Sequence, residues 1–163
     1  MAKKNLTITL YMSELIYDFQ NKAFITGRSR RVGGDAEQAS DMQASDDDED
    51  KNQALRSIQT AYGQLLVEMG EALNSTDSTS SNELIADSNI TLALEMPSNY
   101  NLGVKDALTS AIHDFLINKA LSAWFIMTNK NDAGDYETLA KSSMQNVHNA
   151  FNRRARPVRN NVS

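Results

Sequence analysis

The side chains that enzymes most often use for proton transfer and metal binding are scarce in this sequence of 163 residues. It contains two histidines, His113 and His148, and no cysteine. Without cysteine, a sulfur-based zinc site, a thiolate nucleophile and a disulfide framework are excluded. No Glu-Xaa-Xaa-His pair marks a di-iron site on a helix, so we interpret both histidines as ordinary residues on helix faces.

Three other patterns fall short of known cofactor or catalytic motifs. Gly33 and Gly34 lack the lysine of a phosphate-binding loop and a preceding strand. The acids from Asp46 to Asp50 lack the glycine and the final glutamate of a calcium-binding EF-hand loop. No Gly-Xaa-Ser-Xaa-Gly turn marks a nucleophilic serine, although spacing alone does not exclude a Ser-His-Asp arrangement. We therefore expect no cofactor, no metal and no enzymatic activity.

The charged residues are separated by sign along the chain, whose net charge is −5. Eight acids and no base lie between residues 35 and 50, and these acids are Asp35, Glu37, Asp41, Asp46, Asp47, Asp48, Glu49 and Asp50. Arginines gather just before this stretch and at the end of the chain, as Arg28, Arg30, Arg31, Arg153, Arg154, Arg156 and Arg159. A nucleic-acid binder with a single basic face is not what this pattern indicates.

The acids Asp46, Asp47 and Asp48 have two interpretations. They open the next predicted helix, where exposed amide groups and the helix dipole favour negative charge. They are also candidates for a subunit interface, because the arginines of a neighbouring copy can pair with them.

The C-terminal arginines Arg153, Arg154, Arg156 and Arg159 also have two interpretations. They form either a solvated terminus, favoured by the negative end of the preceding helix, or a segment that docks on a partner. Arginine binds carboxylates and phosphates through two parallel hydrogen bonds, so a docking segment suits an acidic groove on a partner or packaged DNA.

The adjacent aromatic residues Trp124 and Phe125 lie on the broad apolar face of a predicted helix. We interpret them first as part of the hydrophobic core. Because aromatic residues are enriched at the centres of interfaces, a subunit contact is the alternative.

These candidates belong to a chain in which alternating apolar and polar residues predict two strands. The strands cover Asn5 to Leu10 and Ile90 to Met96. They pair with each other, or each pairs with a neighbouring subunit, because isolated two-stranded sheets are marginal. Both arrangements leave sheet edges open.

Apolar residues at helical spacing predict four helices, with Ser13 and Asp132 as N-caps of the first and last. The predicted spans are Ser13 to Gly27, Lys51 to Leu73, Asn101 to Thr128 and Asp132 to Phe151. The short turn between the last two helices requires an antiparallel hairpin.

Three polar segments contain almost nothing to bury, so burial does not offset the entropy of ordering them. They are an acidic, mobile loop over residues 27–50, a linker over residues 74–88 that separates elements rather than packing, and a basic tail over residues 153–163. The predicted fold is one mainly α domain over residues 1–163, a small helical bundle with a minor two-stranded β element and long polar loops.

No export signal or membrane span is predicted. The charged start, Met1 to Lys4, is followed by alternating threonines that break the continuous apolar run of a signal peptide. The longest apolar stretch, around Ala120 to Met127, is too short to span a bilayer. We therefore expect the protein to be cytosolic when it is made.

The second half of the chain contains an apolar helix that ends in an aromatic pair, from Ala107 to Phe125. A turn, a helix that bears Tyr136 and the basic ending Phe151 to Arg159 follow it. This arrangement, over roughly the last 60 residues, resembles the small helical head-tail connector proteins, or neck adaptors, of tailed bacteriophages. The general order of elements in the first half is also similar, but the loop from Arg28 to Asp50 and the two strands depart from the compact members of that family.

The resemblance implies a structural virion protein. Members of the family form rings, usually twelvefold, below the portal and around the DNA channel, and they join the capsid to the tail. For this chain it implies a dodecameric ring, portal and tail or neck proteins as partners, non-specific proximity to channel DNA, and a place in the virion neck after synthesis in the host cytoplasm. The four C-terminal arginines match the basic tail of the family. A helical protein-binding adaptor or regulatory module is the alternative, and a nucleic-acid-binding protein is less favoured.

Overall fold

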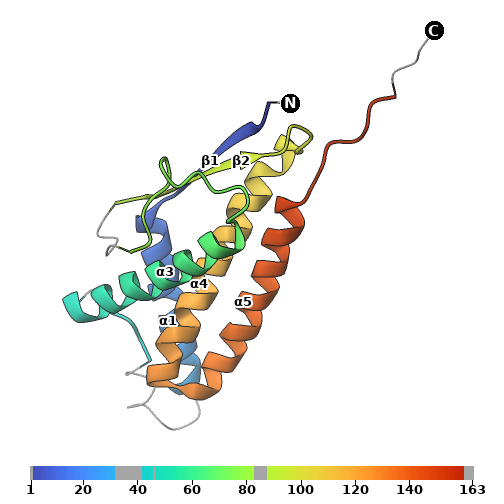
Figure 1. Cartoon of the computed structure of the whole chain (residues 1–163). Coiled ribbons are helices and arrows are strands. Elements are labelled where there is room, and N and C mark those ends of the chain that lie inside the picture. The colour runs from blue at the N-terminus through green and yellow to red at the C-terminus, as the bar shows by residue number, and fades with distance from the viewer. Residues whose placement is uncertain (1, 32–41, 46, 83–87, 160–163) are drawn as a thin grey trace.

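Residues 2–31, 42–45, 47–82 and 88–159 are described by the computed structural model of the chain (Figure 1). Within them, four α-helices, one short 3-10 helix and two β-strands follow one another. Their bounds are β1 Lys4–Leu10, α1 Met12–Arg31, α3 Asp48–Glu68, β2 Ile90–Met96, η1 Leu102–Val104, α4 Lys105–Thr128 and α5 Lys130–Phe151. The prediction of a mainly helical bundle with a minor two-stranded β element is therefore confirmed.

The two strands pair with each other in an antiparallel sheet. The register runs from Lys4 opposite Met96 to Leu10 opposite Ile90. Alternate side chains of the sheet are buried, and these are Leu6, Ile8, Leu10, Ile90, Leu92, Leu94 and Met96. This alternation turns one face of the sheet toward the helices, as expected for a half-buried antiparallel sheet. Of the two pairings that the sequence left open, the structure has the one within the chain.

The segment after α3 was wrongly predicted to be a linker that does not pack. Residues 72–79 run along the outer edge of β2, where the Thr79 amide donates a hydrogen bond to the Thr91 carbonyl at 2.8 Å. The Thr79 hydroxyl accepts a hydrogen bond from the Thr91 amide, and the Ser78 hydroxyl accepts one from the Ala93 amide, both at 2.9 Å. Hydroxyl groups thus replace backbone groups at this edge, so a segment with little to bury is still held in place.

α3 ends at Glu68, whereas the helical spacing of apolar residues predicted an end at Leu73. The chain turns at Gly70, and the Ala72 carbonyl then accepts a hydrogen bond from the Glu95 amide of β2 at 2.6 Å. The last apolar residues of the predicted helix therefore pack beside the sheet. Pairing with a strand edge ended the helix, and periodicity alone does not reveal such an edge.

α1 continues to Arg31, past the predicted stop at Gly27. Gly27 is buried inside the helix, where glycine costs about 1 kcal/mol relative to alanine and packing can offset that cost. Thr26 and Tyr136 share a hydrogen bond of 2.7 Å between their hydroxyls, which ties this end of α1 to α5. Residues 28–31, which were predicted to belong to the mobile loop, are therefore helical.

Part of the predicted loop between α1 and α3 packs into the core. Met42 is fully buried, and its carbonyl accepts a hydrogen bond from Trp124 Nε1 at 2.8 Å. Gln20 Nε2 donates to the Ser45 carbonyl at 3.1 Å. Other parts of the predicted loop and linker lie outside the described residues, and these parts are residues 32–41, Asp46 and residues 83–87.

α4 is the central helix, because it contacts α1, α3, α5 and β1. Figure 1 shows it beside α5 along most of its length. Its buried residues occupy more than one face, and they are Leu108, Ala111, Ile112, Phe115, Leu116, Ile117, Asn118, Ala120, Leu121, Ser122, Trp124 and Phe125. A helix that is apolar over so much of its circumference needs neighbours on several sides. None of the helices in the described part of the chain has the length and apolar character needed to cross a membrane.

α4 and α5 form the predicted antiparallel hairpin, but Asn129 rather than Asp132 is the N-cap of α5. Asn129 Oδ1 accepts a hydrogen bond from the Asn131 amide at 3.2 Å, and its Nδ2 donates to Asp132 Oδ2 at 3.0 Å. Asp132 lies in the first turn, where the exposed amides favour an acid. The two side chains therefore hold each other at the helix start through a direct hydrogen bond.

Candidate functional site

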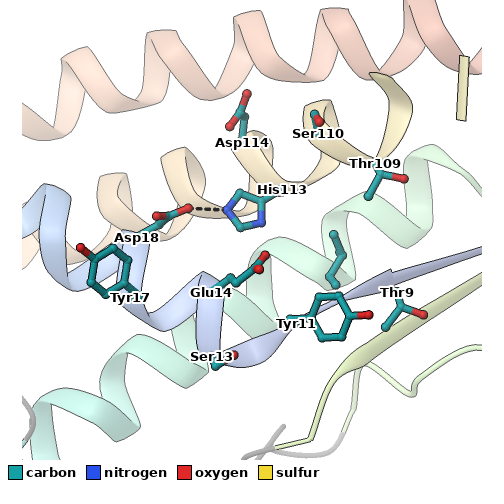
Figure 2. Close-up of a pocket in the computed structure, with 11 residues that line it drawn as sticks. Thr9, Tyr11, Ser13, Glu14, Tyr17, Asp18, Thr109, Ser110, His113 and Asp114 are labelled. Carbon is teal, nitrogen blue, oxygen red and sulfur yellow. Dashed lines mark hydrogen bonds and ion pairs between the residues drawn. The ribbon is translucent and has the colours of Figure 1, made fainter. Parts of the chain in front are cut away.

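A groove opens between the N-terminal halves of α1 and α4, beside the end of β1 (Figure 2). Its volume is about 510 Å³. α1 begins directly after β1, so residues 11–18 lie along the groove opposite residues 109–114 of α4. Its charged and aromatic lining consists of Tyr11, Glu14, Tyr17, Asp18, His113 and Asp114.

An interaction between His113 and Asp18 crosses the groove. His113 Nε2 lies 2.6 Å from Asp18 Oδ2, and the side chains are 20% and 39% exposed. Such a short distance is typical of a charge-assisted hydrogen bond. Interpreting His113 as an ordinary residue on a helix face was therefore too simple, because it links α4 to α1. His148 makes a similar link, with Nε2 at 2.9 Å from Glu68 Oε2.

The groove does not arrange its polar groups for a recognisable catalytic reaction. Ser13 and Ser110 line it, but within the described residues neither hydroxyl forms a hydrogen bond to His113. In the same part of the chain, no three His, Cys, Asp or Glu side chains gather closely enough to hold a metal ion. The geometry therefore offers neither a serine paired with a base nor a set of metal ligands there.

The charge of the groove is negative. Glu14 and Asp114 are exposed, and neither forms an ion pair with another described residue. No lysine or arginine lines the groove. Tyr11 and Tyr17 are 53% and 66% exposed and present aromatic surface beside the carboxylates. Carboxylates beside aromatic rings suit ammonium or guanidinium groups, which bind both.

The predicted arginine segment is exposed and leaves the bundle at the end of α5. Residues 152–159 are all exposed, and Figure 1 shows them pointing away from the helices. The Asn101 amide donates a hydrogen bond to the Arg153 carbonyl at 3.2 Å, and the Ala155 amide donates to the Asn99 carbonyl at 2.7 Å. Beyond Ala155, the described residues make no hydrogen bond or ion pair with the bundle. The segment is thus anchored at its start and free from there to the last described residue.

Tyr100 anchors the start of this segment from inside the core. Its side chain is fully buried, and its hydroxyl donates a hydrogen bond to the Ala150 carbonyl at 3.1 Å. Burial raises the pKa of the Tyr100 hydroxyl above its usual value of 10.0, and the positive charge of Arg154 offsets part of that increase. Tyr100 and Arg154 also form an isolated β-bridge. The backbone of Arg154 is therefore fixed, while its side chain is exposed.

The acids before Lys51 form the start of α3, as one of their two interpretations predicts. Asp47 precedes the helix, and Asp48 lies in its first turn, so α3 begins earlier than predicted. Asp50 Oδ2 accepts hydrogen bonds from the Ser45 amide at 2.9 Å and from the Ser45 hydroxyl at 2.8 Å. Asp50 therefore has a local structural role, whereas Asp46 lies outside the described residues. A subunit interface at Asp46, Asp47 and Asp48 stays a prediction.

Trp124 and Phe125 belong to the core of the chain. Trp124 is 5% exposed, and Phe125 is fully buried. Phe19 packs edge-on against Trp124 with ring centroids 5.8 Å apart, and Tyr136 stacks on Phe125 at 5.2 Å. The structure thus supports the core interpretation of this pair, because almost none of the surface of either side chain is exposed.

An ion pair between α4 and α5 was not predicted from the sequence. Lys119 Nζ lies 2.8 and 2.9 Å from the two carboxylate oxygens of Glu137, and the Ser122 hydroxyl donates to Glu137 Oε2 at 3.1 Å. The hydrogen bond from Lys119 lowers the pKa of Glu137 below its usual value of 4.5. A lysine within the apolar stretch of a helix was the available signal, because such a residue needs a partner on the helix packed against it.

The comparisons with known proteins do not extend this description. No protein-family model matches the chain, and no curated protein or solved structure matches it either. The resemblance to phage connector proteins therefore stays a prediction, and a functional proposal rests on the residues and the geometry described above.

Proposed function

We propose that this chain is a structural assembly protein, and that it acts as a head-tail connector, or neck ring, subunit of a tailed bacteriophage. The observation that carries the proposal is the exposed arginine segment at residues 152–159, which extends from a bundle whose aromatic residues are mostly buried. A basic arm on a closed helical body can bind a partner without changing the fold of that body.

In this proposal the function is mechanical. The α4–α5 hairpin is the rigid part, because one continuous apolar core joins it to α1 and α3. The arginine segment binds carboxylates of a neighbouring copy, of the portal or of a tail protein. The partners are other copies in a ring, usually of twelve in the family that the chain resembles, and the location is the neck of the virion. Channel DNA lies near the ring without sequence-specific contacts.

The test is to express the chain together with the portal protein encoded in the same genome and to image the purified particles by electron microscopy. The proposal predicts a ring of this chain bound to the portal. A variant with glutamine at Arg153, Arg154, Arg156 and Arg159 is expected to lose the ring. A control variant that removes as much charge from exposed bases of the bundle is expected to keep it, and its substituted residues are Arg56, Lys105, Lys130 and Lys141.

Two outcomes would overturn this proposal. One is a genome in which no portal, capsid or tail gene lies near the gene for this chain. The other is full assembly on the portal by the variant that lacks the four arginines.

A protein-binding adaptor is the second candidate, and the negative groove lined by Glu14, Asp18 and Asp114 favours it. An adaptor would be a monomer or dimer that binds a basic peptide of another protein, so its mass under native conditions would not reach that of a ring. Nucleic-acid binding comes third, because the four arginines occupy one narrow segment. That function would show affinity that falls steeply with salt concentration.

A further inference from the structure

β1 has one edge that faces β2 and one edge that no described residue covers. On the far side of β2, hydrogen bonds to residues 72–79 use the amides of Thr91, Ala93 and Glu95 and the carbonyls of Thr91 and Ala93. The backbone groups of these three residues therefore point away from β1.

The register then shows which groups of β1 are free. Thr9, Thr7 and Asn5 lie opposite those same three residues of β2. In an antiparallel pair, opposite residues point their backbone groups either toward each other or both outward. The amides and carbonyls of Asn5, Thr7 and Thr9 must therefore point outward, and no described residue forms a hydrogen bond with them.

Nothing in β1 protects this edge against another strand. Proteins commonly protect an edge with proline, with a bulge or with charged residues in the middle of the strand. β1 is seven residues long and pairs without a bulge. It has no proline, and Lys4 at its first position is its one charged residue. A long, flat and uncharged edge of this kind favours pairing with a further strand.

We infer that β1 pairs with β1 of a second copy of this chain, antiparallel and about a two-fold axis at Thr7. In that register the Thr7 residues of the two copies lie opposite each other, and Asn5 lies opposite Thr9 of the second copy. In this register the outward backbone groups of Asn5, Thr7 and Thr9 all form hydrogen bonds with the second copy. The alternate residues of β1 keep their existing hydrogen bonds to β2. The two sheets become one continuous sheet with helices on one face.

The side chains match this register. Asn5, Thr7 and Thr9 are exposed on the solvent face, so the pairing sets threonine against threonine and threonine against asparagine. Cross-strand threonine pairs stabilise sheets. A shift by one residue would place each residue with outward backbone groups opposite a residue of the second copy whose backbone groups point toward its own β2. Such residues cannot form hydrogen bonds with each other, so this shift is excluded.

Charge also favours a second copy as the occupant. Lys3 and Lys4 lie at one end of β1, and the groove with Glu14 and Asp18 lies at the other end. Antiparallel pairing places Lys3 of each copy opposite Tyr11 of the other, at the mouth of its negative groove. Lys3 already pairs with Glu95 at 3.3 Å, but both side chains are largely exposed, so that pair holds Lys3 weakly.

This inference goes beyond the proposed function and does not depend on it. A two-fold contact uses the same surface on both copies and is complete after two chains, whereas a ring needs a head-to-tail contact through other surfaces. The dimer is measured on the purified chain alone, so its test is separate from binding to a portal.

The first test is a disulfide cross-link. Because the chain has no cysteine of its own, only the introduced cysteines can form it. In the inferred dimer, the two Thr7 Cα atoms are about 5.5 Å apart, a distance that a disulfide spans. The matched control is Thr9→Cys on the same exposed face, because the two Thr9 residues would lie about 13 Å apart. Thr138→Cys on α5 measures chance collisions.

Under mild oxidation, Thr7→Cys is expected to form a covalent dimer at least tenfold faster than Thr9→Cys or Thr138→Cys. A mixture of Asn5→Cys and Thr9→Cys chains is expected to form the mixed dimer. If Thr9→Cys cross-links as fast as Thr7→Cys, or if Thr7→Cys reacts no faster than Thr138→Cys, the two-fold register is wrong.

The second test measures the dimer without a cross-link, by sedimentation over a range of concentrations. Thr7→Lys places two like charges opposite each other, which disfavours pairing, so we expect the dissociation constant to rise at least tenfold. Thr7→Val keeps a β-branched residue and is expected to retain the dimer. Removal of residues 156–163 is also expected to retain it.

Fluorescence of Trp124 would show that each variant is folded, because this single tryptophan is buried. A chain that stays monomeric at every concentration overturns the inference. Loss of the dimer on removal of residues 156–163 also overturns it, because the occupant of the edge would then be the arginine segment.

Discussion

The hydroxyl of Ser57 destabilises the fold, although the side chain is buried in it. It lies on α3 and is 5% exposed, and among the described residues its hydroxyl has no hydrogen-bond partner. A buried hydroxyl without a partner costs about 1–3 kcal/mol. Most other buried polar side chains of the described chain have partners, such as Asn118, which donates to the Ser143 hydroxyl at 3.0 Å. The hydroxyl of Ser57 therefore opposes folding.

Ser57→Ala is expected to raise the free energy of unfolding by about 1 kcal/mol, because it removes this cost and because alanine is the best helix former. Urea denaturation measures the change. Ser142→Ala on the exposed face of α5 is the control, since it has the helix preference without the burial. A midpoint for Ser57→Ala that is no higher than that of the control contradicts the prediction.

Glu137 makes stability depend on pH in the acid range. Lys119 and Ser122 lower the pKa of Glu137 in the folded protein, below the value of 4.5 usual for glutamate. A carboxyl group whose pKa is lower in the folded state stabilises the fold above its unfolded pKa. That stabilisation is lost as the pH falls through the folded value.

We therefore expect the stability difference between the wild type and Glu137→Gln to be full at pH 7 and to shrink below pH 4.5. Denaturation curves at several pH values measure it. Glu71→Gln, at an exposed position, is the control and is expected to show no such trend. A difference that persists unchanged to the lowest pH would mean that the ion pair with Lys119 does not stabilise the fold.

At the scale of elements, Tyr62 connects α3 to the segment that borders β2. Its hydroxyl is buried and donates a hydrogen bond to the Thr79 carbonyl at 2.8 Å. Thr79 in turn bonds to Thr91 of β2 through its amide and its hydroxyl. The Tyr62 hydroxyl thus adds a tie to α3 for a segment that also bonds to β2 and has few apolar residues of its own.

Tyr62→Phe is expected to destabilise the protein by about 1 kcal/mol, the usual net contribution of one hydrogen bond, and more if the carbonyl is left without a partner. Faster amide hydrogen exchange at Thr79 and Thr91 would show that the loss is local. Tyr17→Phe is the control, because Tyr17 is 66% exposed. Equal exchange in both variants would contradict a role for Tyr62 at this edge.

The same substitution changes the response to alkali. Burial raises the pKa of Tyr62 from 10.0 to about 12. A group whose pKa is higher in the folded state contributes stability below its unfolded pKa, and that contribution is lost as the pH rises toward the folded value. The wild type is therefore expected to lose stability between pH 10 and 12 through Tyr62, and Tyr62→Phe is expected to remove that part of the loss.

The elements differ in how far the sequence predicted them. Both strands and the α4–α5 hairpin were predicted closely, because alternation and helical spacing report on which side chains are buried. The errors lie at ends and in polar segments. Gly27 did not end α1, Leu73 left the helical pattern to lie beside a strand, and the hydroxyls of residues 78 and 79 replaced backbone partners. In each place tertiary contacts decided the outcome, and composition does not record them.

The groove could not be predicted for a related reason. Its two sides come from residues 9–18 and 109–114, and the bond between His113 and Asp18 joins residues 95 positions apart. The sequence identified His113 as one of two histidines but gave no sign of its partner. The arginine segment was predicted because its charge is contiguous, although its anchoring at Asn99 and Asn101 was not.

At the scale of the molecule, the apolar core, the free edge of β1 and the arginine segment have different roles in what we propose. The apolar core is shared by α1, α3, α4, α5 and both strands. The free edge of β1 and the arginine segment both lie outside that core. Changes at these two surfaces should therefore alter association while leaving the stability of one chain almost unchanged, since distant sites usually contribute independently.

Two truncations of the arginine segment test this independence. The described part of residues 156–163 is exposed and forms no hydrogen bond or ion pair with the bundle, so the melting temperature is expected to stay the same when these residues are removed. Removal of residues 153–163 also breaks the backbone hydrogen bonds to Asn99 and Asn101. Two such bonds contribute about 1–3 kcal/mol, and each kcal/mol corresponds to about 2–4 °C in a chain of this size.

Both truncated chains are expected to fold, with cooperative transitions in the fluorescence of Trp124, and both are expected to fail in assembly on the portal. Removal of residues 156–163 is the decisive variant, because it removes Arg156 and Arg159 without breaking any described hydrogen bond or ion pair of the bundle. If it lowers the melting temperature by several degrees, the segment is part of the fold. If it assembles normally, residues 156–163 are not the arm that docks on a partner, and the groove beside α1 becomes the stronger candidate.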